Sequence, residues 1–256
     1  MLKNKAGLAA MILAGISACF STTIFAVPLQ ILEFKKAQLS STEQSQLCEQ
    51  VKELCQKKPQ LLSLRTPDQA LWTLSVGNIA QFGNSATGFK LLRQWHIPLV
   101  AEEEMARSGQ YVFPKLFPMD QNRYAIAVID TFSEMYSGGG AGIERASFYE
   151  LKDYGKTYRF IENYPFSFNR MIRACFSEQD YESSKGKCHD EDGLSLDIRP
   201  IKPMLWQFRY RYRLDVSPAS DSGEKSFKGS RNLNIDLNKV PKQPNIPASW
   251  DYAGME

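Results

Sequence analysis

Histidine is almost missing from this chain, which has two, His96 and His189, among 256 residues. Histidine is the side chain most often used as a general acid or base near neutral pH, so its scarcity leaves few ways to build a catalytic centre. His96 lies between Trp95 and Ile97, a setting typical of a packed core position. We therefore predict no catalytic residue, metal ligand or cofactor from the sequence.

A surplus of positive charge is lacking as well. Without Lys3 and Lys5, which belong to the leader described below, 29 of the 31 basic residues remain against 28 acidic residues, a net charge of +1. Nucleic-acid binding depends on a strong basic field, so the sequence argues against a nucleic-acid partner.

Long apolar runs are absent after residue 32, so no second membrane span is predicted there. Before it, Met1–Lys5 is basic and Ala6–Leu32 is uncharged, which is the layout of a secretory signal peptide. We favour cleavage after Ala26. The lipobox-like Ile16–Cys19 offers an alternative in which Cys19 carries a lipid, and an uncleaved anchor is the third fate. Each predicts a periplasmic or extracellular protein, or one that a lipid anchors to the outer membrane.

The remaining four cysteines form an even set, which suits two disulfides in an oxidising compartment. Cys175 and Cys188 enclose a polar loop and are the preferred pair, which leaves Cys48 for Cys55. That second pair conflicts with helical spacing, because a helix holds residues seven apart at about 10.5 Å and a disulfide needs about 4.4–6.8 Å between Cα atoms. Either the helix breaks before Cys55, or the cysteines pair across the chain.

Helix signals are few. Ser40 with Glu43 and Ser41 with Gln44 form overlapping capping boxes and predict a helix from about residue 41 to Lys58. A shorter second helix is expected over residues 100–107, where alanine and glutamate are frequent.

Strand signals dominate the rest, and the clearest is the stretch 206–216. Every even position from Trp206 to Val216 is apolar or aromatic and every odd one is polar, which predicts a long strand with one buried face. Further strands are expected at the ranges 71–76, 124–132, 145–151, 157–161, 171–176, 194–198 and 233–237.

These signals together predict an α+β fold that is mainly antiparallel β, as a curled sheet or a sandwich, with one N-terminal helix. We divide the chain into a signal peptide (1–26), an N-terminal helical segment (27–60) and a single β-rich domain (61–256) with a proline-spaced tail. The stretch 217–231, rich in serine, glycine and lysine, is predicted as a surface loop.

Two features are candidate binding sites. Arg209, Arg211 and Arg213 share the polar face of the long strand, where guanidinium groups would grip carboxylates or phosphates. The alternative is an ordinary wet face neutralised by cross-strand carboxylates. The glycine-rich stretch Ser137, Gly138, Gly139, Gly140 up to Gly142 joins two predicted strands, lacks the Lys-Ser/Thr ending of a phosphate loop, and is interpreted as a hairpin tip that contacts a partner.

One acidic stretch invites a metal-site interpretation. His189, Asp190 and Asp192 are close in sequence, but successive residues on a strand point to opposite faces, so the cluster converges only in a loop. We interpret it as a solvated turn beside a disulfide.

Three functions remain. The favoured one is an envelope binding or inhibitor protein, which presents the loops 137–143, 178–192 and 217–231 to a protein partner; immunity proteins that neutralise toxins belong to this class. The alternatives are a hydrolase that acts on the cell wall or on lipids, and a structural envelope lipoprotein. The membrane would be contacted only through a lipid on Cys19 or an uncleaved leader.

Overall fold

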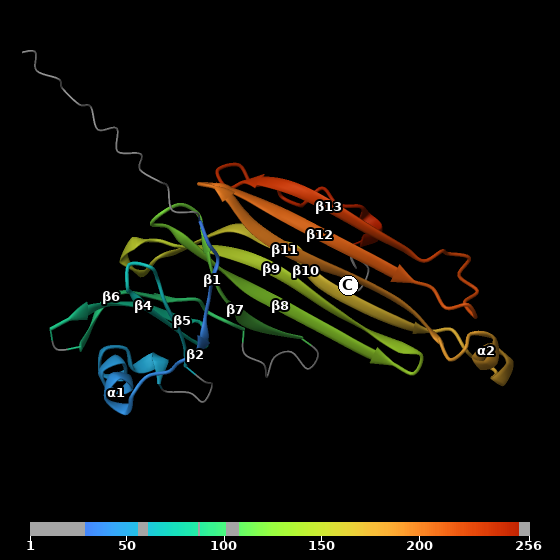
Figure 1. Cartoon of the computed structure of the whole chain (residues 1–256), viewed down its shortest axis with the longest axis horizontal. Helices are drawn as coiled ribbons and strands as arrows, with labels where there is room; N and C mark the ends of the chain where they lie inside the picture. Colours follow the sequence, from blue (N-terminus) through green and yellow to red (C-terminus); the bar gives the residue numbers. More distant parts are fainter. Residues whose placement is uncertain (1–28, 56–60, 87, 101–107, 251–256) are drawn as a thin grey trace, which may run out of the picture.

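A computed structural model describes residues 29–55, 61–86, 88–100 and 108–250. This part is mainly antiparallel β-structure in two sheets, with one ten-residue helix near its N-terminal end (Figure 1). The predicted fold class is therefore confirmed. The predicted leader, Cys19 included, and most of the helix expected at 100–107 lie outside the described residues.

The larger sheet has eight strands in the order β1-β7-β8-β9-β10-β11-β12-β13. From β7 onward each strand pairs with the next one in the sequence, because short reversals connect most of them. The strands are β1 (Leu32–Glu33), β7 (Ser108–Pro118), β8 (Tyr124–Tyr136), β9 (Gly139–Leu151), β10 (Thr157–Arg173), β11 (His189–Lys202), β12 (Leu205–Asp215) and β13 (Phe227–Asp236).

This sheet is curled but not closed, and β10 is where it bends. Strand β10 pairs with β9 along most of its length through several bulges, but with β11 only from Ser167 to Arg173. Bulges bend a strand and increase its twist. Beyond the paired part, β11–β13 curl over β7–β9, so that Trp206 on β12 lies 5.5 Å from Phe148 on β9, measured between ring centroids.

Strand β12 confirms the prediction made from the alternating stretch. Its even-numbered side chains are buried in a first core, and its odd-numbered ones lie at the surface or only partly buried. The proline-spaced tail folds back to the same core, where Trp250 stacks on Tyr212 at 5.6 Å with an interplanar angle of 4°. Burial of each such aromatic side chain contributes about 2 kcal/mol, which fixes the register of β12.

The smaller sheet has five strands in the order β2-β3-β4-β5-β6. It packs against β7–β9 of the larger sheet through a second core, which contains Trp72 and Trp95 from the smaller sheet, Ile97 just after β6, and Ile126 and Val128 from the larger sheet. The strands are β2 (Lys35–Lys36), β3 (Leu62–Arg65), β4 (Leu71–Ser75), β5 (Asn78–Ser85) and β6 (Gly88–His96).

Helix α1 (Ser41–Gln50) covers the other face of the smaller sheet through a third core that includes Leu47 and Phe82. Its predicted start is confirmed, because the Ser40–Glu43 capping box forms. Its predicted end at Lys58 is wrong: the helix stops at Gln50, and Val51 leaves helical backbone angles.

The break at Val51 resolves the conflict between helix and disulfide. A 3-10 turn over Lys52–Leu54 follows it and brings Cys55 within 5.8 Å of Cys48, measured between Cα atoms, so the two cysteines are joined. Cys175 and Cys188 form the second disulfide. Both pairs are those expected from the sequence.

The predicted surface loop 217–231 is wrong in its last part. Strand β13 already begins at Phe227, and Lys228 and Ser230 stand opposite Arg213 and Arg211 of β12. The stretch lacks alternating apolar residues because position 229, which faces the core, is a glycine. A larger side chain there would displace the Trp250 indole that packs against it.

Candidate functional site

Three connections gather at one end of the larger sheet, because neighbouring strands are antiparallel and turn at alternate ends (Figure 1). They are residues 137–138 between β8 and β9, residues 174–188 between β10 and β11, and residues 216–226 between β12 and β13. We call these connections, together with the adjoining strand residues 135–136 and 171–173, the loop end. It includes parts of all three loops that the sequence favoured for recognition.

Hydrogen bonds tie these connections together. The Arg173 N–H donates to the Gly138 carbonyl at 2.5 Å, which joins the first connection to the end of β10. The Ser217 hydroxyl donates to the Lys187 carbonyl at 2.6 Å, and the Ser217 N–H donates to the Asp190 carboxylate at 2.7 Å. The three connections therefore hold fixed positions relative to one another.

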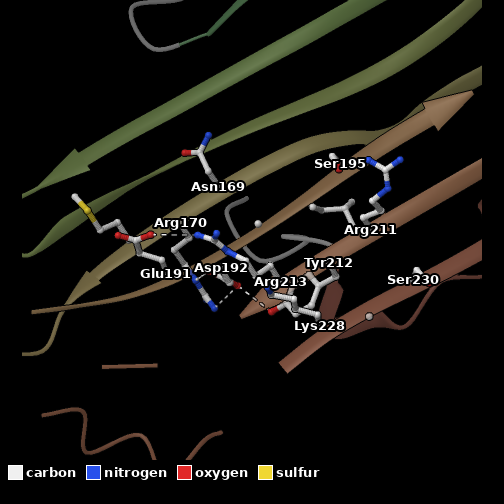
Figure 2. A pocket seen from close by; sticks show the side chains of 14 residues that line it. Asn169, Arg170, Glu191, Asp192, Ser195, Arg211, Tyr212, Arg213, Lys228 and Ser230 are labelled. Carbon is white, nitrogen blue, oxygen red and sulfur yellow. Dashed lines mark hydrogen bonds and ion pairs between the residues drawn. The ribbon is translucent and has the colours of Figure 1, made fainter. Parts of the chain in front are cut away.

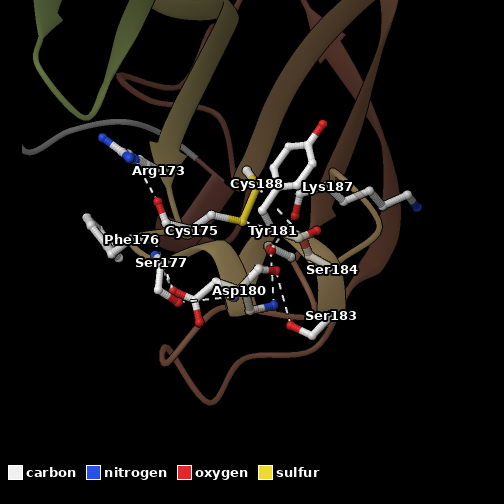
Figure 3. The surroundings of a disulfide bond; sticks show 12 residues. Arg173, Cys175, Phe176, Ser177, Asp180, Tyr181, Ser183, Ser184, Lys187 and Cys188 are labelled. Carbon is white, nitrogen blue, oxygen red and sulfur yellow. Dashed lines mark hydrogen bonds between the residues drawn. A yellow bond between two sulfur atoms is a disulfide. The ribbon is translucent and has the colours of Figure 1, made fainter.

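The second connection carries the Cys175–Cys188 disulfide and a short helix, α2 (Glu178–Ser183) (Figure 3). Asp180 and Ser177 form a capping box at its start. Hydrogen bonds from the Phe176 N–H and the Ser177 hydroxyl lower the pKa of Asp180, so its carboxylate stays charged. Ser184 is buried, with its hydroxyl 3.3 Å from the Cys175 sulfur.

The glycine-rich stretch forms a shorter tip than predicted. Only Ser137 and Gly138 are in the turn, and Gly139 already pairs with Tyr136. A side chain at Gly139 would collide with the Met171 carbonyl oxygen, so this glycine permits the close approach of β10. Gly140 stands opposite Met171 within the sheet.

Large apolar side chains are exposed on the loop end. The exposed fractions are 83% for Met135, 76% for Phe176 and 60% for Tyr181, and Tyr136 and Met171 are also exposed. The Arg173 guanidinium lies over the Phe176 ring, 5.4 Å from its centroid. Phe176 and Tyr181 belong to the disulfide-closed connection, and the other three belong to the adjoining ends of β8 and β10.

A groove of about 700 Å³ opens on β10–β13 beside the loop end (Figure 2). Gly193 and Ser195 leave room in its middle. Its charged side chains are Arg211, Arg213, Lys228 and Glu191 on the wet face and the Arg170–Asp192 pair on the other face, which gives a net charge of +2. The remaining lining residues are Asn169, Met171, Leu194, Tyr212, Gly229 and Ser230.

The structure places only part of the predicted arginine row in this groove. Arg211 and Arg213 line it, and Arg209 does not. Carboxylates offset the two that do: Arg213 lies 2.9 Å from Asp215 and 3.5 Å from Glu191, and Arg211 lies 3.8 Å from Asp197. Glu191 and Asp197 lie on β11 and are cross-strand partners of the kind that the alternative interpretation expects, whereas Asp215 lies on β12 itself. Anion binding by the row therefore stays a prediction.

Three of the lining residues, on the buried face of the same strands, form an ionic cluster that the sequence analysis missed. Arg170 donates two hydrogen bonds to Asp192, at 2.8 and 2.9 Å, and the Tyr212 hydroxyl donates to the same carboxylate at 3.1 Å. Burial, and then the charge of Asp192, raise the pKa of Tyr212 to about 12, so its phenol stays protonated. The cluster holds β10, β11 and β12 together under the groove.

The acidic stretch near Cys188 does not converge. It forms the start of β11, where Asp190 and Asp192 face one side and accept hydrogen bonds from Ser217 and Arg170 respectively. Among the described residues no group of three or more histidine, cysteine, aspartate and glutamate side chains is arranged to hold a metal ion.

Within the described ranges no helix has both the length and the apolar character needed to cross a membrane. Comparison of the chain with known protein families, curated proteins and solved structures found no match. The two disulfides fit a compartment outside the reducing cytoplasm. The molecule is thus an antiparallel β protein with two disulfides. Its candidate functional surface is the loop end, where the three connections and the exposed apolar side chains lie.

Proposed function

We propose that this chain is an exported bacterial envelope protein that binds a protein partner at the loop end. The observation that carries the proposal is the meeting of three connections that are distant in the sequence, held by a disulfide and by hydrogen bonds across them. A surface that is rigid before binding loses little conformational entropy when it binds, which favours affinity.

The chemistry of the loop end suits a protein surface. Methionine and aromatic side chains are enriched at protein interfaces, where they provide large contact areas, and arginine is enriched there too. Met135, Phe176 and Tyr181 provide such contacts, and Arg173 lies over the Phe176 ring. The adjacent groove adds Arg211 and Arg213, which would pair with acidic side chains of the partner.

A toxin-neutralising immunity protein is the finer form of this proposal. Such a protein would block its target by covering it with the loop end. The export leader predicted for residues 1–26 and the disulfides support action outside the cytoplasm, where an inhibitor of this kind would meet its target.

Affinity capture from an envelope extract of the producing cells tests the proposal, followed by calorimetry with each captured protein in purified form. We expect one partner whose binding is lost in the double variant Met135→Ser/Phe176→Ser. Both residues are exposed, so this variant is expected to fold. A captured protein that binds this variant as well as it binds the original chain contradicts the proposal.

The matched control is Tyr154→Ser. Tyr154 is 97% exposed and lies in the 3-10 turn Asp153–Gly155, at the opposite end of the strands from the loop end. The control removes a large side chain that is even more exposed than Met135 or Phe176 and should leave binding unchanged. Loss of binding in this control, or failure to capture any partner, would also count against the loop end.

A further inference from the structure

Strand β13 leaves one long edge of the larger sheet open. In the described part of the chain, β13 pairs with β12 alone and is the last strand of its sheet. It has ten residues, Phe227–Asp236, whereas the edge strands β1 and β2 have two each. An open edge presents unpaired backbone N–H and carbonyl groups that can template a further strand.

The fourth edge strand, β6, shows how this fold covers an edge. The Gln50 side chain of α1 accepts a hydrogen bond from the Leu91 N–H at 2.7 Å and donates to the Phe89 carbonyl at 2.9 Å. Strand β13 has no comparable cover among the described residues. This contrast makes the edge of β13 a candidate for pairing with a strand of another chain.

We propose that β13 pairs antiparallel with β13 of a second copy of this chain, with Asn232 opposite Asn232 across a two-fold axis. The charges of the strand favour this register. It sets Lys228 of each copy opposite Asp236 of the other, and Ser230 opposite Asn234. All five of these residues share the exposed face of the strand, so opposite charges meet twice and like charges never stand opposite one another.

Other symmetric registers fit less well. A two-fold axis perpendicular to the sheet keeps the exposed faces of the two strands on the same side. Only residues of the same face can then stand opposite each other, so at the axis one residue stands opposite its own copy. An axis through Arg231 places two arginines opposite each other, and like charges directly opposite are destabilising. An axis through Leu233 shortens the overlap and leaves Lys228 without Asp236.

The proposed pairing has a consequence for the groove. The axis is perpendicular to the joined sheet, so the grooves of the two copies open on the same side of it. Lys228 and Ser230 line the groove, so Asp236 and Asn234 of the second copy would form part of its rim. This inference does not rest on the proposed function, and a monomeric protein could still bind a partner at the loop end.

Light scattering over a series of protein concentrations tests the dimer. We expect a concentration-dependent dimer whose dissociation constant rises about tenfold or more in Lys228→Glu, because this change replaces two attractive pairs with two repulsive ones. The charge swap Lys228→Glu/Asp236→Lys should restore dimerisation. A protein that stays monomeric up to millimolar concentration, or a swap that fails to rescue, overturns the proposal.

Thiol cross-linking in a Cys19→Ser background tests the register. Asn232→Cys should give a covalent dimer with a short bis-maleimide, because the two thiols would meet at the axis. Asn234→Cys is the matched control: its two copies would be four residues out of step, about 13 Å apart along the strand. Equal cross-linking in both variants, or none at Asn232→Cys in a dimeric sample, rules the register out.

Discussion

Tyr212 is the residue at which the first core and the groove meet. Its ring stacks on Trp250, and its hydroxyl donates to Asp192, the carboxylate that also binds Arg170. The three side chains come from β10, β11 and β12, so the cluster constrains three strands at once. Removal of any one of them would leave a buried polar group unsatisfied.

The raised pKa of Tyr212 gives a prediction for alkaline pH. Its folded value of about 12 lies above the ordinary value of 10.0, chiefly because burial disfavours the phenolate. The neutral phenol therefore contributes stability that is fully present below pH 10 and is lost as the pH rises toward 12. In Tyr212→Phe this loss should be shallower, as measured by urea unfolding at a series of pH values.

Tyr154→Phe serves as the control for this measurement, because it makes the same chemical change at a side chain that is 97% exposed. Tyr111 and Tyr164 also have pKa values raised to about 12, so part of the loss should persist in Tyr212→Phe. Identical pH profiles for the original chain and Tyr212→Phe would contradict the assignment.

Gly139 gives a second prediction at the scale of one residue. Alanine there would collide with the Met171 carbonyl oxygen at a φ of +156°, so Gly139→Ala should lower the free energy of unfolding by about 1–3 kcal/mol. Gly138→Ala is the matched control, since the nearest atom to its new methyl carbon is 3.8 Å away. Chemical denaturation measures both, and equal stabilities would refute the close approach.

Single residues also show where sequence reasoning stops. The Ser40–Glu43 capping box was predictable because its spacing is local, and it forms as expected. The bond between Arg170 and Asp192 was not, because the two residues are 22 positions apart and become neighbours only through the pairing of β10 with β11.

Helices and strands show the same difference between local signals, which the sequence reveals, and long-range contacts, which it does not. Strand β12 was predictable from its own alternation, because one of its faces is buried along its whole length. The end of α1 could not be predicted from helical spacing alone, because that spacing conflicts with the Cys48–Cys55 bond, and the helix breaks before Cys55. The start of β13 was missed because Lys228, Gly229 and Ser230 carry no alternating pattern and become a strand through pairing with β12.

The connection closed by Cys175 and Cys188 is the element on which the proposed binding surface depends. Replacing both cysteines by serine should lower the free energy of unfolding by about 3 kcal/mol, because the open connection gains conformational entropy in the unfolded chain. Denaturant unfolding measures this loss, and calorimetry should show weaker binding of the partner at the loop end.

The matched control is the double serine variant at Cys48 and Cys55. That disulfide closes a shorter loop beside α1, with a separation of 7 residues rather than 13, so a smaller loss of stability is expected. Partner binding should be unchanged, because α1 packs on the smaller sheet. Equal effects of the two variants on binding would contradict the assignment of the loop end.

At the scale of the whole molecule, the sequence predicted many strands, as a curled sheet or a sandwich, but not which strands belong to each of the two sheets. Strand β8 illustrates why. The structure buries Ala125, Ala127 and Ile129 of this strand in the first core and Ile126 and Val128 in the second, so different elements cover its two faces. The elements that pack on each face of β8 are set by contacts between distant segments, and a local sequence pattern does not encode such contacts.

Because the second core is built from both sheets, they should unfold together as the single β-rich domain predicted from residue 61 onward. Tryptophan fluorescence can follow each sheet separately. Trp72 and Trp95 stack at 5.3 Å in the smaller sheet and report on it when Trp206 and Trp250 are replaced by phenylalanine. The converse variant, with Trp72 and Trp95 replaced, reports on the first core.

Each reporter variant is compared with its own far-ultraviolet circular dichroism, since the substitutions themselves lower stability. Coincident denaturation midpoints within each variant are expected, because loss of either sheet would expose Ile126 and Val128 to water. A fluorescence midpoint well below the dichroism midpoint in either variant would mean that the two sheets are separate units. In that case β7–β9 would need to be stable with one face uncovered, which their apolar sequence does not favour.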